Sequence, residues 1–236
     1  MSPTASKTFL KDNLSHFLMP LVIGDIHGCH RQLNDLLALL SPSSNTPIIT
    51  LGDYIDRGPD TKGVIDTLIA LGPQLIHLKG NHDVFMEQAR TDSAMYDFWL
   101  QPMVGGQETL DAYGGHLDNV PDAHWQFLAS AKLYHELDDF ICVHGGLDPK
   151  VPLAQQSPEV LLNLRFQHAK KHCSGKTIIC GHTRQIDGKP KLRRNTLCID
   201  TNVFGGGYLT AFDTQQHIIY QVDENSQCQQ FPFSIS

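Results

Sequence analysis

Oxygen and nitrogen donors recur in glycine-flanked blocks at even spacing along the first third of the chain. The blocks read GDIHG at 24–28, GDYIDRG at 52–58 and GNHD at 80–83. Asp25, Asp53 and Asn81 therefore follow one another at intervals of 28 residues. Two more histidines, His144 in VHGG and His182 in GHT, extend the set. Carboxylate, amide and imidazole donors without thiolate suit Mn²⁺, Fe or Zn²⁺ better than Ca²⁺, which prefers oxygen ligands.

The number of candidate ligands predicts more than one metal ion. The set is Asp25, His27, Asp53, Asn81, His144 and His182. Six ligands are too many for one tetrahedral ion, whereas two ions that share a carboxylate would use them all. Paired ions about 3.5–4 Å apart can clamp the attacking and leaving oxygens of an in-line displacement at phosphorus. Arg57, in the second block, adds a planar donor fork that fits phosphate oxygens.

The elements that must position these residues alternate along the chain. Apolar runs before the three blocks, PLVIGD, PIITLGD and QLIHLKGN, predict buried parallel strands. Residues 29–40 and 60–71 repeat apolar side chains at helical spacing, so helices should join the strands. One strand, one helix and a return loop account for the 28-residue interval. The carboxyl ends of parallel strands meet at one edge, where the side chains of the three blocks should converge.

The second half of the chain has a different order of predicted helices and strands. Residues 84–136 are expected to form a mainly helical insertion over the sheet edge, and 157–172 a further helix. Short apolar runs from residue 138 to residue 223 predict a second, mostly antiparallel sheet. We expect an N-terminal extension, residues 1–20, followed by one domain, residues 21–236, that contains the insertion.

Composition excludes several classes of partner. The formal net charge is −7 and the sequence pI is about 6.0, so no positive field favours nucleic acid. No apolar run approaches the roughly 18 residues of a membrane span, and the N-terminus lacks the apolar core of a signal peptide. We expect a cytoplasmic protein without nucleic-acid or membrane partners, either a monomer or a small homo-oligomer.

The ordered blocks resemble the calcineurin-like metallophosphoesterases. Within them the chain is similar to the PPP-type Ser/Thr protein phosphatases and their bacterial and phage relatives, from about residue 21 to 213. The resemblance implies an α/β fold, a four-layer α/β/β/α sandwich with a βαβαβ core and a dinuclear metal centre at the strand ends. GGQETLDAYG and DTNVFGGGYLTAFD resemble the bacterial branch, in which the second of these segments closes the second sheet.

The resemblance also implies which residues hold the ions. Asp25 and His27 would hold the first ion, and Asp53 would bridge the two. The ligands of the second ion would be Asn81, His144 and His182. The cofactors implied are two divalent metal ions, Mn²⁺ before Fe or Zn²⁺.

The remaining roles concern the phosphoryl group and the leaving group. His82 would act as the general acid, oriented by Asp56, while Arg57 binds the phosphoryl group. Arg165 would be a second phosphate clamp, although Asn163 stands where the family usually carries an aromatic residue. Metal-bound hydroxide would attack phosphorus directly, without a phosphoenzyme, as His82 protonates the departing alkoxide.

Two of the blocks indicate different classes of substrate. Asp56 in GDYIDRG is typical of protein phosphatases, whereas Asp83 in GNHD is typical of enzymes that split diadenosine tetraphosphate symmetrically. Because Asp56 takes part in the chemistry, we predict a serine/threonine protein phosphatase acting on a phosphorylated protein or a small phosphoester. A symmetrical dinucleoside tetraphosphate hydrolase is the alternative. A catalytically inactive metal-binding scaffold would have lost His82 or Asp56, and both are present.

Overall fold

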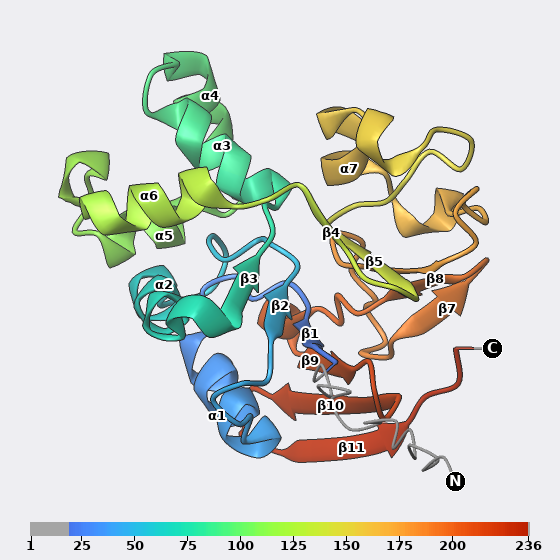
Figure 1. The fold of residues 1–236 in the computed structure, drawn as a ribbon. Helices are drawn as coiled ribbons and strands as arrows, with labels where there is room; N and C mark the ends of the chain where they lie inside the picture. Colours follow the sequence, from blue (N-terminus) through green and yellow to red (C-terminus); the bar gives the residue numbers. More distant parts are fainter. Residues whose placement is uncertain (1–18, 236) are drawn as a thin grey trace, which may run out of the picture.

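The computed structural model describes residues 19–235 as two β-sheets flanked by helices (Figure 1). The predicted extension, residues 1–20, lies outside the described residues except for its last two. Within these residues the first sheet has six strands and the second has five. Among the described residues, no helix combines the length and the apolar character that a membrane crossing requires.

The first half of the chain forms the alternating unit that the sequence predicts. It runs through β1 (Leu21–Ile23), α1 (His30–Leu40), β2 (Ile48–Thr50), α2 (Thr61–Ala70) and β3 (Leu75–His77). The three strands are parallel, with Val22 opposite Ile49 and Ile49 opposite Ile76. The side chain of Asp60 accepts a hydrogen bond from the Gly63 backbone N–H and so caps the start of α2. The three blocks consequently leave the sheet at the same edge.

The second sheet differs from the expectation. Its strands are β4 (Tyr134–Glu136), β5 (Phe140–Val143), β6 (Thr177–Cys180), β7 (Lys191–Arg193) and β8 (Thr196–Cys198). The central strands β5, β6 and β8 are parallel, and only the edge strands β4 and β7 are antiparallel. The prediction of a mostly antiparallel second sheet was therefore wrong. Parallel and antiparallel buried strands both appear as short apolar runs, so pairing direction is not encoded locally.

The last strands belong to the first sheet and not to the second. These strands are β9 (Tyr208–Asp213), β10 (Ile218–Asp223) and β11 (Cys228–Pro232). β9 pairs antiparallel with β1, with Phe212 opposite Val22, so the first sheet has the order β11-β10-β9-β1-β2-β3. The expectation that the segment ending in YLTAFD closes the second sheet was wrong. Apolar residues on both faces of β9 let it fill a central place: Leu209 and Ala211 pack with the helices, and Phe212 packs between the sheets.

The predicted helix over 157–172 is also shorter than expected. It ends after α7 (Pro158–Asn163), and a 3-10 turn follows at Phe166–His168. Leu164 and Arg165 adopt extended backbone angles, and the Phe166 N–H donates to Thr183 Oγ1 at 2.9 Å. That bond ties the turn to the segment after β6, which explains why the chain leaves the helix there.

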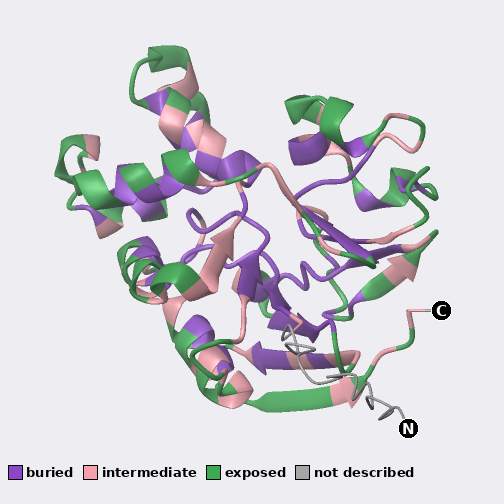
Figure 2. Cartoon of the chain, in the orientation of Figure 1, coloured by how far each residue is buried: buried purple, intermediate pink, exposed green. Residues whose placement is uncertain are grey.

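Apolar side chains separate the elements into four layers (Figures 1 and 2). Leu33 and Leu36 of α1 pack with residues of α2 and one face of the first sheet. Ile49 and Phe212 face Cys142 and Ile179 across the space between the two sheets. Leu161 of α7 packs on the outer face of the second sheet. The predicted four-layer α/β/β/α sandwich is confirmed.

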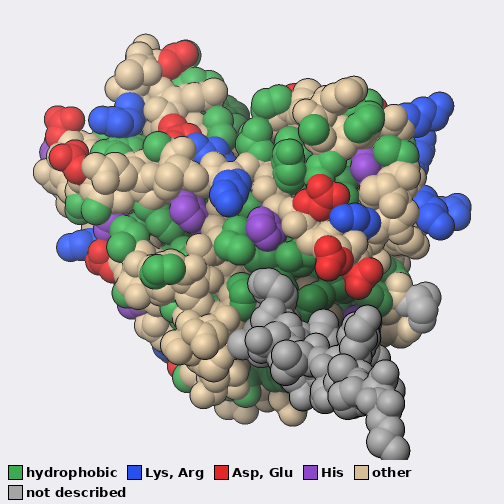
Figure 3. All heavy atoms as spheres, in the orientation of Figure 1, with side chains coloured by type: hydrophobic (Ala, Val, Ile, Leu, Met, Phe, Trp, Pro, Cys, Tyr) green, Lys and Arg blue, Asp and Glu red, His purple; other side chains and the backbone are tan. Residues whose placement is uncertain are grey.

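Four helices follow β3 before the second sheet begins. They are α3 (Asn81–Ala89), α4 (Ser93–Trp99), α5 (Gly106–Ala112) and α6 (Asp122–Ser130). In Figure 1 they form one group beside the carboxyl end of the first sheet. Acidic and basic side chains are interspersed over the face of the molecule drawn in Figure 3.

Candidate metal and phosphoester site

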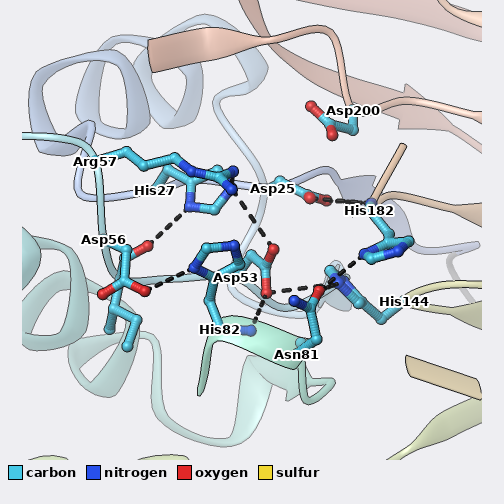
Figure 4. Close-up of polar contacts among 12 residues, drawn as sticks. Asp25, His27, Asp53, Asp56, Arg57, Asn81, His82, His144, His182 and Asp200 are labelled. Atoms are coloured by element: carbon cyan, nitrogen blue, oxygen red, sulfur yellow. Dashed lines mark hydrogen bonds and ion pairs between the residues drawn. The ribbon is translucent and has the colours of Figure 1, made fainter. Parts of the chain in front are cut away.

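Six parallel strands, three from each sheet, end beside one cluster of polar side chains (Figure 4). The residues that follow the strands are Asp25 after β1, Asp53 after β2, Asn81 after β3, His144 after β5, His182 after β6 and Asp200 after β8. Because parallel strands deliver their carboxyl ends to one edge, two facing sheets bring both sets of ends together. All six predicted metal ligands lie in this cluster.

The donor atoms fall into two groups that share Asp53. One group contains His27, Asp53 and His82, and the other contains Asp25, Asp53 and His144, with donor atoms within 4.8 Å of one another in each. Asp53 Oδ2 lies 3.6 Å from His27 Nε2, and Asp53 Oδ1 lies 3.5 Å from His144 Nε2. One carboxylate thus presents a different oxygen to each group. That arrangement fits a centre of two divalent ions with Asp53 between them.

Asn81 joins the remaining histidines to the second group. Its Oδ1 lies 2.9 Å from His144 Nε2 and 2.8 Å from His182 Nδ1. An amide oxygen and two imidazole nitrogens that point to one place are ligands that a transition metal accepts. These three side chains come from three strand ends in two sheets, so the sheets must pack as they do for the group to form.

Backbone carbonyls fix two of the imidazoles. His27 Nδ1 lies 2.8 Å from the Ile55 carbonyl oxygen and His144 Nδ1 lies 3.0 Å from that of Leu51. An Nδ1–H that donates to a carbonyl leaves Nε2 unprotonated and able to bind an ion. In the structure the His27 Nε2 is 2.8 Å from Arg57 Nη1. An ion on His27 Nε2 would replace that hydrogen bond and release the guanidinium group.

Burial controls the charges in the cluster. It lowers the pKa values of His27, His144 and His182, that of His182 to about 3, and so keeps these rings neutral. Burial, followed by the nearby carboxylates of Asp200 and Asp53, raises the pKa of Asp25 well above its ordinary value. Neutral imidazoles and crowded carboxylates are what bound cations would stabilise.

The backbone at the site is strained. Five non-glycine residues have φ between 45° and 69°, namely His27, Asp53, Asp56, Arg57 and His182. The left-handed region costs an L-residue about 1–2 kcal/mol, so five such residues lower stability appreciably. Strain of this kind gathers where side chains are held for function.

A buried histidine–carboxylate pair lies next to the first group. His82 Nδ1 is 2.6 Å from Asp56 Oδ2, and both side chains are buried. Trp99 Nε1 and Thr109 Oγ1 each donate to Asp56 Oδ1 at 2.9 Å. Burial raises the pKa of Asp56, while its hydrogen bonds oppose that rise. With Nδ1 held by Asp56, the other ring nitrogen of His82 is available for proton transfer.

The two predicted phosphate-binding arginines differ in burial and in contacts. Arg57 is half-buried, and its guanidinium lies 4.7 Å from the Phe204 ring centre. The backbone N–H of Arg57 donates to the Gly105 carbonyl at 2.9 Å. Gly105 has φ +89°, and a Cβ there would lie 2.6 Å from Arg57 Cγ, so only glycine fits. Arg165 is exposed in the extended turn after α7, and its charge contributes to lowering the pKa of His182.

Some residues that support the site were missed in the sequence. Trp99 and Thr109 lie in helices and carry no local signal for their contact with Asp56. Asp83 lies in the first turn of α3, and its carboxylate accepts the backbone N–H groups of Asp53, Tyr54 and Gly80 at 2.8–3.1 Å. Asp200 could have been found, since it follows an apolar run as Asp25 and Asp53 do.

Comparison with known proteins decides the family. Residues 20–194 match the model of the calcineurin-like phosphoesterase family. The chain belongs to this family. The resemblance stated from the ordered blocks is thereby confirmed.

Curated relatives carry two different activities in their names. The chain is 33% identical over 156 residues to the serine/threonine-protein phosphatase PP2A-like PPG1 of Saccharomyces cerevisiae, covering 62% of this chain and 38% of that protein. It is 29% identical over 180 residues to the symmetrical bis(5'-nucleosyl)-tetraphosphatase of Nitrosomonas europaea, covering 72% and 62%. The chain thus spans less than two thirds of the length of these relatives.

Solved structures agree in fold. A protein serine/threonine phosphatase from Saccharomyces cerevisiae superimposes with a TM-score of 0.62 at 17% identity, covering 94% of this chain and 82% of that one. A cold-active protein tyrosine phosphatase gives a TM-score of 0.60 at 15% identity, covering 90% and 78%.

Proposed function

We propose that this protein is a metal-dependent phosphomonoesterase that dephosphorylates phosphoserine and phosphothreonine in proteins. The observation that carries the proposal is the buried contact between His82 and Asp56, 2.6 Å long and braced by Trp99 and Thr109. A serine or threonine alkoxide is a poor leaving group and needs a proton as the P–O bond breaks. A nucleotide that leaves as a phosphate needs that proton far less.

Each residue of the cluster has a proposed part in this reaction. The ions, when bound by the two ligand groups around Asp53, would polarise the phosphoryl oxygens and lower the pKa of a water molecule. His82, held at Nδ1 by Asp56, presents its other nitrogen to the leaving oxygen and delivers the proton. Arg57, released from His27, turns its donor fork to the phosphoryl oxygens, and Arg165 approaches from the His182 side.

The ions we propose are Mn²⁺. The donor set combines carboxylate and amide oxygens with imidazole nitrogens and contains no thiolate, which suits Mn²⁺, with Fe or Zn²⁺ also compatible. Measuring activity after chelation and reloading with each metal in turn identifies the productive ion.

A symmetrical dinucleoside tetraphosphate hydrolase is the second candidate. It is favoured by the Nitrosomonas europaea relative, which matches over more of this chain than the yeast phosphatase does. The other argument for it, Asp83, carries less weight. The Asp83 carboxylate is occupied by three backbone N–H groups, so it braces the Asp53 loop and does not select a substrate.

Parallel turnover measurements separate the two candidates. With Mn²⁺ present, we expect kcat/KM for a phosphoserine peptide to exceed that for diadenosine tetraphosphate. Asp56→Asn should lower turnover of the phosphopeptide by about 10²–10⁴-fold and that of an aryl phosphate much less, because the aryl oxide leaves without a proton. If diadenosine tetraphosphate is cleaved to two diphosphates with a kcat/KM well above that of every phosphopeptide tested, the second candidate replaces this proposal.

A further inference from the structure

Asp200 holds an unsatisfied oxygen inside the protein. Its side chain is buried, with 2% of its surface exposed. Oδ1 accepts the Asn202 backbone N–H at 3.1 Å, whereas Oδ2 has no hydrogen-bond partner. Among the described residues it is the only buried side-chain nitrogen or oxygen atom in that condition. Burying a carboxylate oxygen without a hydrogen-bond partner costs free energy. We therefore expect its partner to be a group that does not belong to the chain.

The position of Asp200 shows where that partner belongs. β8 is the one parallel strand of the six whose terminal side chain has no role among the predicted ligands. The close-up places the Asp200 carboxylate beside Asp25 and the His182 backbone (Figure 4). The Asp200 carbonyl accepts the Gln185 N–H at 2.8 Å, which ties this residue to the segment that carries His182. The fold therefore fixes Asp200 next to the donor group that contains Asp25.

The charges around Asp200 also point to a cation. The negative groups that act on it include Asp53, and Asp200 in turn acts on Asp25. The positive groups are Arg57 and Arg184, and neither makes a hydrogen bond or ion pair with Asp200 in the described residues. Like charges buried together repel unless a cation lies among them.

We propose that Asp200 is a positioning residue of the metal centre, whose Oδ2 accepts a hydrogen bond from a group bound to the ion that Asp25 helps to hold. Its negative charge adds to the attraction for that ion, and its hydrogen bond orients what the ion carries. This inference rests on the two-ion site and not on the choice of substrate. Residues that support metal ligands in this way typically change metal affinity by 10–100-fold when replaced.

Metal binding without substrate tests the inference. The protein is stripped with a chelator, and Mn²⁺ binding is followed by calorimetry for the wild type and for Asp200→Asn. Asparagine keeps the oxygen that accepts the Asn202 N–H and removes the charge. We expect the affinity for one of the two ions to fall by about 10–100-fold. The melting temperature of the stripped protein should not fall, because a buried unpaired charge has been removed.

Asp213→Asn is the matched control. Asp213 is also buried and its Oδ1 also accepts backbone N–H groups, from Gln215 and Gln216. It lies opposite Leu21, at the far end of β1 from Asp25. This variant should bind Mn²⁺ as the wild type does. If Asp200→Asn does not fold, Asp200→Ser replaces it, because the serine hydroxyl oxygen can still accept a hydrogen bond and carries no charge.

Other outcomes would overturn the inference. An affinity for both ions within about twofold of wild type would show that Asp200 does not serve the metal centre. An unchanged affinity with a raised KM for phosphoester would mean that Asp200 holds Arg184 or Arg57 for the substrate. A wild-type protein that binds a single ion at full activity would refute the two-ion site itself. Failure of the phosphopeptide assay alone would leave the role of Asp200 standing.

Discussion

The strand ends and the helical segment 93–112 support the site in different ways. The strand ends carry the candidate ligands on short loops, where backbone carbonyls fix imidazoles, as that of Ile55 fixes His27. The helical segment carries no ligand, but it supplies Trp99, Gly105 and Thr109, which hold Asp56 and Arg57. The candidate ligands and the residues that brace Asp56 therefore lie in separate parts of the molecule. Variants in the two regions should affect different measurements.

Replacing the shared carboxylate should have the largest effect. Asp53→Asn leaves one oxygen and removes the charge, so the residue can no longer bridge two ions. Loss of an ion forfeits several kcal/mol of charge stabilisation, which corresponds to a fall in kcat/KM of about 10³-fold or more. Elemental analysis should find at least one ion missing. A variant that keeps two ions and near-normal turnover would show that Asp53 is not the bridge.

His82→Asn should come next and should separate chemistry from metal binding. The variant lacks the proton donor held by Asp56, so turnover of alkyl phosphoesters should fall by about 10²–10⁴-fold. Aryl phosphates, whose leaving oxygen needs less help, should lose less, and two ions should remain bound. His82 also lies in one of the two donor groups, so the metal content of the variant shows whether His82 binds an ion. Loss of an ion, or equal losses on both substrates, would favour a ligand or structural role.

The contrast between the regions also explains what the sequence could predict. Asp25, Asp53 and Asn81 follow strands in glycine-flanked blocks, so local patterns locate them and the parallel topology brings them together. Trp99 and Thr109 reach Asp56 across 43 and 53 residues of chain, and nothing within their own helices marks that contact.

The sequence also failed to predict which strands pair with one another. β9 carries apolar residues on both faces, as β6 does, and only the packed structure shows that β9 pairs with β1 and β6 with β5 and β8. Local hydrophobic pattern identifies a buried strand, whereas the choice of neighbour depends on contacts far along the chain. The convergence of the candidate ligands could be predicted in spite of this, because each of them depends on the end of its own strand.

Trp99→Phe should have the smallest effect and gives the sharpest test of the comparison. Trp99 is fully buried, and its Nε1 donates to Asp56 Oδ1 at 2.9 Å. Phenylalanine fills most of the space but removes this donor, while Thr109 and His82 still hold the carboxylate. A hydrogen bond to a charged group contributes about 1.5–3 kcal/mol, and partial compensation by Thr109 should limit the loss of alkyl phosphoester turnover to about tenfold.

The controls for Trp99→Phe show whether the variant affects the contact with Asp56 or the candidate ligands at the strand ends. Trp125→Phe is matched, since Trp125 is a buried tryptophan of α6 whose ring lies against Arg90 and not against Asp56. It should leave the ratio of alkyl to aryl phosphate turnover unchanged. Trp99→Phe should lower that ratio while Mn²⁺ affinity stays at the wild-type value, because no strand-end ligand is touched. A fall in Mn²⁺ affinity in Trp99→Phe would mean that the helical segment also positions the ligands, and the separation between the two regions would be lost.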